Sequence, residues 1–209
     1  DPIDPFRFTS SKRAGYDWWS LQTLVKHPPP NVDAAWIKND LDRFIAVRLA
    51  LRQLTAVPRA DSRTLVRRIY YDLIGLPAPA EAIDKFDEDP SPQAWERLVD
   101  GLLASKHYGE RWARHWLDVV RFGESHGYEY NQPREAAWHY RDWVIRSLNE
   151  DLPYDQFARM QVAGDVLKPN TLEGAAAVGF LVAGTHNTVL GASTAMKLAG
   201  RHEELEEMA

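Results

Sequence analysis

The sequence predicts an all-α protein, and three observations point to that class. Apolar residues recur every three to four positions in several segments, which is the period of an amphipathic helix. No segment alternates apolar and polar residues for long, and no hairpin signal such as Asn-Gly occurs. We therefore expect a single irregular multi-helix domain over residues 34–209, preceded by an extended Pro-rich arm over residues 1–33.

The predicted arm has little periodicity and contains a run of prolines from Pro28 to Pro30. Such a run favours the polyproline II conformation and is typical of a spacer. Trp18 and Trp19 offer aromatic surface that would pack an extended arm onto its parent domain. The alternative is that these two side chains, together with Tyr128, contact a polysaccharide or a partner domain.

Helix start and stop signals divide the first half of the predicted domain. Asp33 is the expected N-cap of a helix that reaches about Leu54. A second helix is expected to begin near Asp61 or Ser62. It should stop at Gly75, because glycine readily takes the left-handed conformation that ends many helices.

A short helix is expected over residues 79–87, and Ser91 with Pro92 marks the start of the next one. The central helix follows, and its bulky residues are spaced by four, three, four and three positions: Tyr108, Trp112, His115, Val119 and Phe122. This spacing predicts a buried helical stripe. His115 lies where the stripe borders a charged face, so we expect chemistry at this border.

The second half of the domain has a polar loop over residues 123–132, after which Pro133 is expected to restart a helix. Residues 151–153 predict a tight turn. The remaining expected elements are helices over residues 154–164, 171–181 and 193–209, and a loop over residues 184–187. Thr171 is the expected cap of its helix, whose Ala and Gly residues would let a neighbour approach closely.

Composition excludes several classes of function. The net charge of −5 argues against a general nucleic-acid binder, because the chain does not neutralise phosphates in bulk. No apolar run approaches the length of a membrane span. The chain has no Cys, which excludes thiolate metal sites and covalent haem c attachment within these residues.

Two His-x-x-Asp pairs, His115/Asp118 and His139/Asp142, raise the possibility of a divalent metal site. Residues three positions apart share a helix face, so a carboxylate can orient an imidazole or both can bind one ion. Imidazole and carboxylate ligands suit Zn, Fe or Mn. The predicted metal ligands are His115, Asp118, Glu124, His126 and Glu129, and they would serve a metal-dependent hydrolase or lyase. The alternative is a core histidine that bonds to Asp118 or to a backbone carbonyl.

The segment from Tyr108 to Asp165 is also dense in Arg, Asp and Glu. One interpretation is a surface network of ion pairs. The other is a polar cleft in which arginines hold an anionic or polyhydroxylated ligand. The predicted cleft residues are His115, Asp118, Arg121, Glu129, Arg141, Asp142 and Asp165. In this scheme Asp118 orients His115, and Asp165 either points back at the cleft or caps a local turn.

Several motifs in order resemble those of a known family. They include LVRRIYYDLIGLP at residues 65–77, YGERWARHWLD at residues 108–118 and PYDQF at residues 153–157. Residues 41–45, 89–92, 140–142 and 163–165 match as well. The chain from about residue 36 to residue 209 is similar to the DUF1549 domain, the planctomycete cytochrome-associated PSCyt2 domain.

This resemblance implies a functional context without an established activity. Family members are typically large exported proteins, often with a cytochrome-c-like domain upstream and a DUF1553 domain downstream. The family pattern usually continues, after a segment like residues 203–208, into a Cys-x-x-Cys-His haem-attachment motif. We therefore expect a periplasmic or secreted scaffold or substrate-side module of an oxidoreductase or electron-transfer system. Either the chain stops before a haem c segment or the protein lacks that segment. No haem ligand is therefore expected within these residues, and a divalent metal is the alternative cofactor.

Overall fold

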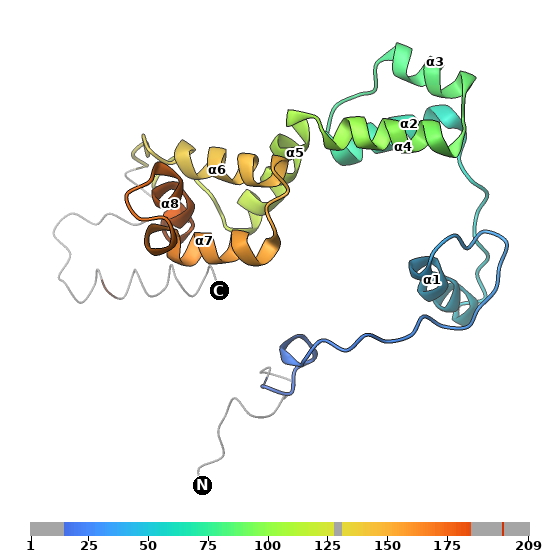
Figure 1. The fold of residues 1–209 in the computed structure, drawn as a ribbon, viewed down its shortest axis with the longest axis horizontal. Coiled ribbons are helices and arrows are strands. Elements are labelled where there is room, and N and C mark those ends of the chain that lie inside the picture. The colour runs from blue at the N-terminus through green and yellow to red at the C-terminus, as the bar shows by residue number, and fades with distance from the viewer. Residues whose placement is uncertain (1–14, 128–130, 185–197, 199–209) are drawn as a thin grey trace, which may run out of the picture. The chain divides into compact units, whose positions relative to one another are not determined.

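The fold was analysed in a computed structural model, which describes residues 15–127, 131–184 and 198. Within these residues the chain forms eight α-helices and two short 3-10 helices (Figure 1). The described part contains no strand; Ser125 and Pro133 form an isolated antiparallel bridge. The predicted all-α class is therefore confirmed. The loop predicted over residues 184–187 lies outside the described residues except for Gly184, and the helix predicted over residues 193–209 lies outside them except for Leu198.

The chain divides into two compact units, Asp1–Arg59 and Ala60–Ala209. The first unit holds the N-terminal segment, a 3-10 helix at Trp19–Leu21 and helix α1 at Asp40–Leu51. Within this segment Trp19 is 77% exposed. The predicted arm, with its boundary at residues 33–34, stays a prediction.

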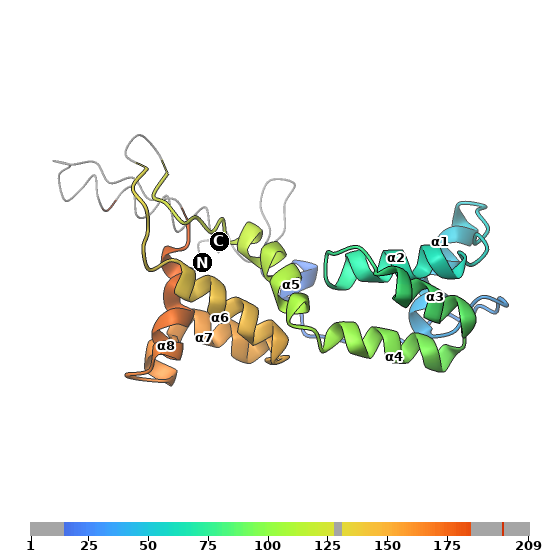
Figure 2. The same cartoon turned by 90° about the horizontal axis from the view of Figure 1, so that it is seen from above.

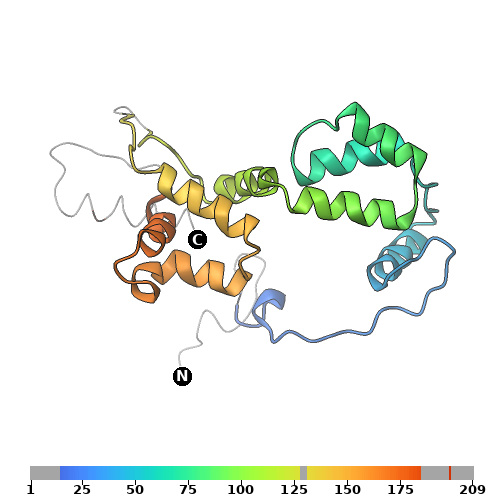
Figure 3. The ribbon, with the colours of Figure 1, turned by 45° about the horizontal axis from the view of Figure 1, so that its top comes forward.

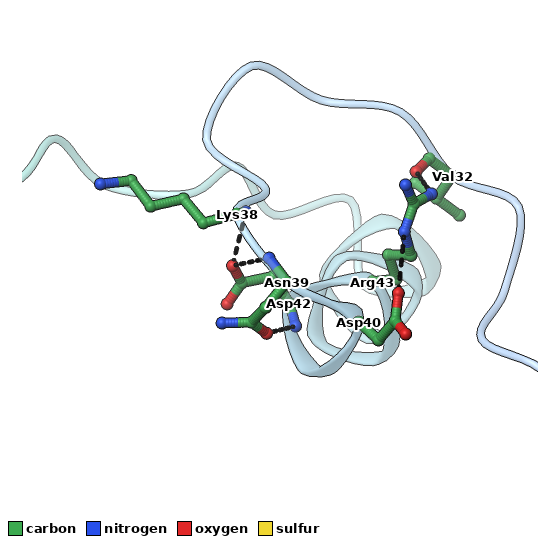
Figure 4. A network of polar contacts seen from close by, with 6 residues as sticks. All are labelled: Val32, Lys38, Asn39, Asp40, Asp42 and Arg43. Atoms are coloured by element: carbon green, nitrogen blue, oxygen red, sulfur yellow. Dashed lines mark hydrogen bonds and ion pairs between the residues drawn. The ribbon is translucent and has the colours of Figure 1, made fainter.

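Helix α1 begins later than predicted, because Asn39 and not Asp33 is its N-cap. The side-chain oxygen of Asn39 accepts a hydrogen bond from the Asp42 N–H at 3.1 Å. The Asp42 carboxylate accepts in return from the N–H groups of Asn39 and Lys38, at 3.2 and 2.8 Å (Figure 4). This reciprocal capping box satisfies backbone donors that the helix itself leaves without partners.

The second unit begins with three helices: α2 at Ser62–Leu73, α3 at Ala80–Glu88 and α4 at Pro92–Leu103 (Figure 3). Their start and stop signals match the predictions. Asp61 accepts from the Thr64 N–H at 2.8 Å, and this bond lowers the pKa of Asp61 from its ordinary value. Gly75 has a φ of +71° and lies just beyond α2.

Helix α2 packs against α3, α4 and α5, and its fully buried residue is Val66. The contact with α5 involves Gly75, because a Cβ built there would lie 2.6 Å from Cδ of Arg111. The positive φ of Gly75 favours glycine, and any larger residue there would also displace the Arg111 side chain.

The main core lies among the four remaining helices of the second unit (Figure 2). These are α5 at Lys106–Val119, α6 at Trp138–Asn149, α7 at Tyr154–Leu167 and α8 at Leu172–Ala177, which continues as a 3-10 helix at Val178–Val182. Trp143 of α6 stacks on Phe157 of α7, with ring centroids 5.2 Å apart and an angle of 11° between the rings. Trp143 and Phe157 are 2% and 5% exposed, so burial of their large rings adds an apolar contribution to stability.

One predicted boundary in this region is wrong for a local reason. The helix expected to restart at Pro133 begins only at Trp138, because Pro133 pairs with Ser125 and the Arg134 N–H donates to the Glu124 carbonyl at 2.8 Å. The central helix begins at Lys106, with Ser105 as its N-cap.

Small residues bring the helices of this core close together. A Cβ at Gly109 of α5 would lie 2.5 Å from the Ile145 carbonyl oxygen of α6. The Asn149 side chain accepts from the Gly109 N–H at 2.8 Å and donates to the Lys106 carbonyl at 3.1 Å. Asn149 thus links the end of α6 to the first turns of α5.

Gly164 of α7 and Gly174 of α8 form a second close contact. A Cβ on Gly174 would lie 2.5 Å from the carbonyl oxygens of both Gly164 and Lys168. Thr171 caps α8 by accepting from the Gly174 N–H at 3.0 Å. The predicted cap and the predicted close approach of small residues are both confirmed.

Replacing Gly174 with Ala should destabilise the protein, because the clashing atoms belong to the backbone and cannot move aside. We expect the free energy of unfolding to fall by about 2 kcal/mol, measured by urea denaturation. Gly101→Ala in α4 is the matched control, since no atom lies within 4 Å of its added Cβ. Equal stability of the two variants would contradict the close packing of α7 on α8.

Three polar side chains form a closed network inside the core. The Trp116 indole N–H donates to the Tyr140 hydroxyl and to the Gln161 side-chain oxygen, both at 3.0 Å. The Tyr140 hydroxyl donates to the same Gln161 oxygen at 2.6 Å, and the Gln161 amide donates to the Phe157 carbonyl at 3.2 Å. Satisfying each group avoids the free-energy cost of burying it without a partner.

Burial raises the pKa of Tyr140 far above its ordinary value. A raised pKa means that the folded state holds the proton more tightly than the unfolded chain. This contribution is complete below the unfolded pKa of about 10 and is lost as pH rises above it.

The stability of the wild type should therefore fall more steeply than that of Tyr140→Phe between pH 10 and pH 12, by up to about 1.4 kcal/mol per pH unit. At pH 7 the variant should be about 1 kcal/mol less stable, because it lacks the buried hydrogen bonds. Denaturation curves across this pH range measure both effects. Tyr71→Phe, at a more exposed site on α2, is the control, and its stability should change with pH as that of the wild type does. Parallel slopes of stability against pH for the wild type and Tyr140→Phe would refute the raised pKa of Tyr140.

Candidate functional site

The bulky stripe of α5 is not buried, and this corrects the prediction made from its spacing. Trp112 is 41% exposed and Val119 is 73% exposed. The residues that α5 buries completely against its neighbours are Gly109 and Ala113. Because α6 approaches closely over these small residues, the bulky side of α5 remains open to solvent.

An open groove of about 550 Å³ lies along this stripe. One wall comes from α5, and the other comes from the end of α6, the turn at residues 151–153 and the first turn of α7. The groove is lined by Tyr108, Trp112, His115, Trp116, Val119, Ser147, Leu148, Asp151, Leu152, Pro153, Tyr154 and Phe157. Its size lies within the range of small-molecule sites, about 300–1,000 Å³.

Aromatic rings contact one another along the groove. The Trp112 and His115 rings meet edge to face at 5.5 Å, and Tyr108 lies 6.1 Å from Trp112. Trp116 meets Phe157 edge to face at 5.0 Å. Because the Trp116 N–H is bonded within the core, this residue contributes only apolar surface to the groove.

Five polar side chains interrupt this apolar lining: Tyr108, His115, Ser147, Asp151 and Tyr154. Asp151 has a φ of +49°, a conformation that Asp and Asn tolerate better than most residues. Asp151 is the one carboxylate among the lining residues. No Lys or Arg is among them, so the lining residues include no permanent cation. The groove therefore suits a ligand that is neutral or carries hydrogen-bond donors.

Three of the predicted charged residues meet at a different place. The Arg141 guanidinium forms ion pairs with Glu124, from the polar loop, and with Asp142 at 3.1 Å. Arg141 and Asp142 are each a little over one-third exposed, and Glu124 is more exposed. None of the three lines the groove, so the structure separates His115 from this charged cluster.

The polar loop is also attached to the end of the 3-10 helix that follows α8. The Gly123 N–H donates to the Ala183 carbonyl at 3.1 Å, and the Arg134 guanidinium donates to the same carbonyl at 3.0 Å. Within the loop, the His126 N–H donates to the Gln132 carbonyl at 2.9 Å. These bonds hold the described part of the loop against the core.

The other predicted site residues are dispersed. Asp118 is exposed and forms no ion pair with a described residue, and Arg121 follows α5 with a φ of +52°. Asp165 lies near the end of α7, where its carboxylate accepts from the Val166 N–H at 3.0 Å. Glu129 and Tyr128 lie outside the described residues.

The described residues contain no group of three His, Asp or Glu side chains placed to hold a metal ion. His139 stacks on Trp138 with ring centroids 3.7 Å apart. Asp142, its predicted partner, pairs with Arg141. Because the predicted ligand Glu129 lies outside the described residues, the metal site stays a prediction.

Sequence reasoning missed Ser147, Asp151 and Tyr154 as lining residues. The turn at residues 151–153 was predicted, but nothing in the sequence places it opposite the stripe of α5. One signal was available, since Gly109 and Ala113, spaced four positions apart, give one face of α5 small residues that the neighbouring face with Tyr108, Trp112 and Val119 lacks. That asymmetry favours close helix packing on the small side.

The described residues form an all-helical domain with an open groove, and each of its described helices is too short or too polar to cross a membrane. The family model described as "PSCyt2: Protein of unknown function (DUF1549)" matches residues 40–209. The chain therefore belongs to the PSCyt2 family, whose name associates it with planctomycete cytochromes. No curated protein and no solved structure matches the chain.

The ion pairs of Arg141 should order the polar loop while adding little to global stability. Both pairs are partly exposed, so Arg141→Gln should lower the free energy of unfolding by less than about 1 kcal/mol. Amide hydrogen exchange at His126 should become faster by several-fold, because Glu124 loses its attachment to α6. Arg146→Gln, on the same helix, is the control and should change neither quantity; identical exchange in the two variants would contradict this role.

Proposed function

We propose that the domain is the substrate-side module of an exported, haem-c-associated electron-transfer system. The observation that carries the proposal is the open groove, which places His115 and Asp151 beside a row of exposed aromatic rings. Membership of the PSCyt2 family supports the cytochrome context.

The residues of the groove suit binding better than electron transfer. Aromatic walls provide apolar contact area, and a few polar groups fix the orientation of a ligand. Imidazole can donate or accept a proton near neutral pH, so His115 is the groove residue suited to proton transfer with a bound substrate. The chain has no Cys to attach haem c, so the electrons would pass through a haem on another domain.

The charged cluster of Arg141, Glu124 and Asp142 has a separate role in this proposal. It fixes the polar loop beside the core and leaves charged groups at the surface. Surface charges attract a partner that carries opposite charges at its own surface. This attraction speeds association and weakens as salt is added. The cytochrome-c-like and DUF1553 domains of the family are the proposed partners, in a periplasmic or secreted protein.

The chain should bind a cytochrome-c-like domain taken from a protein of the same family, measured by calorimetry and by the haem reduction potential. We expect binding that weakens several-fold between low and high salt, because exposed charges contribute to the encounter. A c-type cytochrome from outside the family is the control. Absence of binding at low salt, with an unchanged reduction potential, would overturn the proposed function.

A further inference from the structure

We propose that the groove between α5 and the α6–α7 turn binds the rings of a neutral sugar chain. The inference rests on the proposed function, because it names the substrate class of the same groove. It stands on three features of the lining residues: exposed aromatic rings on both walls, a carboxylate on one wall, and the absence of a permanent cation.

The aromatic rings match the apolar faces of a sugar. Trp112 on one wall and Tyr154 on the other are 41% and 70% exposed, so a ligand reaches both rings without any opening of the helices. The C–H groups on one face of a pyranose carry partial positive charge, which suits the negative face of an aromatic ring. Trp112 is braced by Tyr108 and His115, which contact its ring.

The polar groups match the hydroxyl groups of the same ligand. The Asp151 carboxylate accepts hydrogen bonds, and the Tyr154 hydroxyl and the His115 imidazole each both donate and accept. A purely apolar ligand would cover Asp151 without replacing its bonds to water, which costs free energy. A sugar replaces those bonds with its own hydroxyl donors.

Charge decides between neutral and anionic sugars. Asp151 is the one carboxylate among the lining residues, and no Lys or Arg among them would compensate a sulfate or uronate group. An anionic sugar would bring like charges together in a partly apolar groove, where screening by water is weak. Chains of neutral sugars are therefore the favoured ligands.

The test is calorimetric titration of the full chain with neutral hexaoses of glucose, mannose and xylose. Oligoalginate represents the anionic sugars, and choline represents a cation that an aromatic groove with a carboxylate would also attract. We expect at least one neutral hexaose to bind with a sub-millimolar dissociation constant and more tightly than either comparison ligand. Binding of no hexaose, or tighter binding of oligoalginate or choline, would overturn the proposal.

Two variants tie the binding to the groove. Trp112→Ala should weaken the binding about tenfold, because it removes a stacking ring. Trp138→Ala is the matched control, since Trp138 is 45% exposed and lies outside the groove. Asp151→Asn should weaken binding several-fold without backbone strain, because Asn also tolerates the positive φ of this position.

Circular dichroism and a urea titration establish that each variant is folded. Unchanged affinity in folded Trp112→Ala would place the sugar elsewhere and overturn the inference. The cytochrome titration is carried out without sugar, so the two proposals fail separately. Loss of sugar binding with intact cytochrome binding would refute only the ligand class.

Discussion

The close approach of α6 to α5 is the constraint on which the rest of this core depends. Gly109 and Ala113 present almost no side chain to α6, and Asn149 closes the contact with two hydrogen bonds to the α5 backbone. Because α6 packs over this face of α5, Trp112, His115 and Val119 on the neighbouring face are left to line the groove. The groove is thus a direct result of how one helix divides its small and large residues.

The buried network of Trp116, Tyr140 and Gln161 fixes the positions of α5, α6 and α7 relative to one another. A core made only of apolar groups tolerates small shifts between helices, whereas hydrogen-bonded partners fix their relative positions. The network joins α5, α6 and α7, and Trp143 stacked on Phe157 fills the space beside it. The helices that carry the groove walls are therefore held by directional bonds as well as by apolar contact.

Local signals in the sequence predicted the helical class, the caps at Ser91 and Thr171, and the start of α2 near Asp61 and its end at Gly75. They failed where long-range contacts decide the outcome. The periodicity of α5 identified a bulky stripe, but whether a neighbour covers that stripe depends on the position of α6. The separation of His115 from Arg141 has the same origin, because sequence spacing does not show which helix faces meet.

Trp116 belongs both to the network inside the core and to the lining of the groove. A ligand that packs on the Trp116 ring would therefore contact a residue that hydrogen bonds to α6 and α7 already hold in place. Binding would therefore restrict few side-chain motions on that side of the groove, and the loss of conformational entropy would oppose binding less. Rigidity acquired in folding would thus serve recognition at the surface.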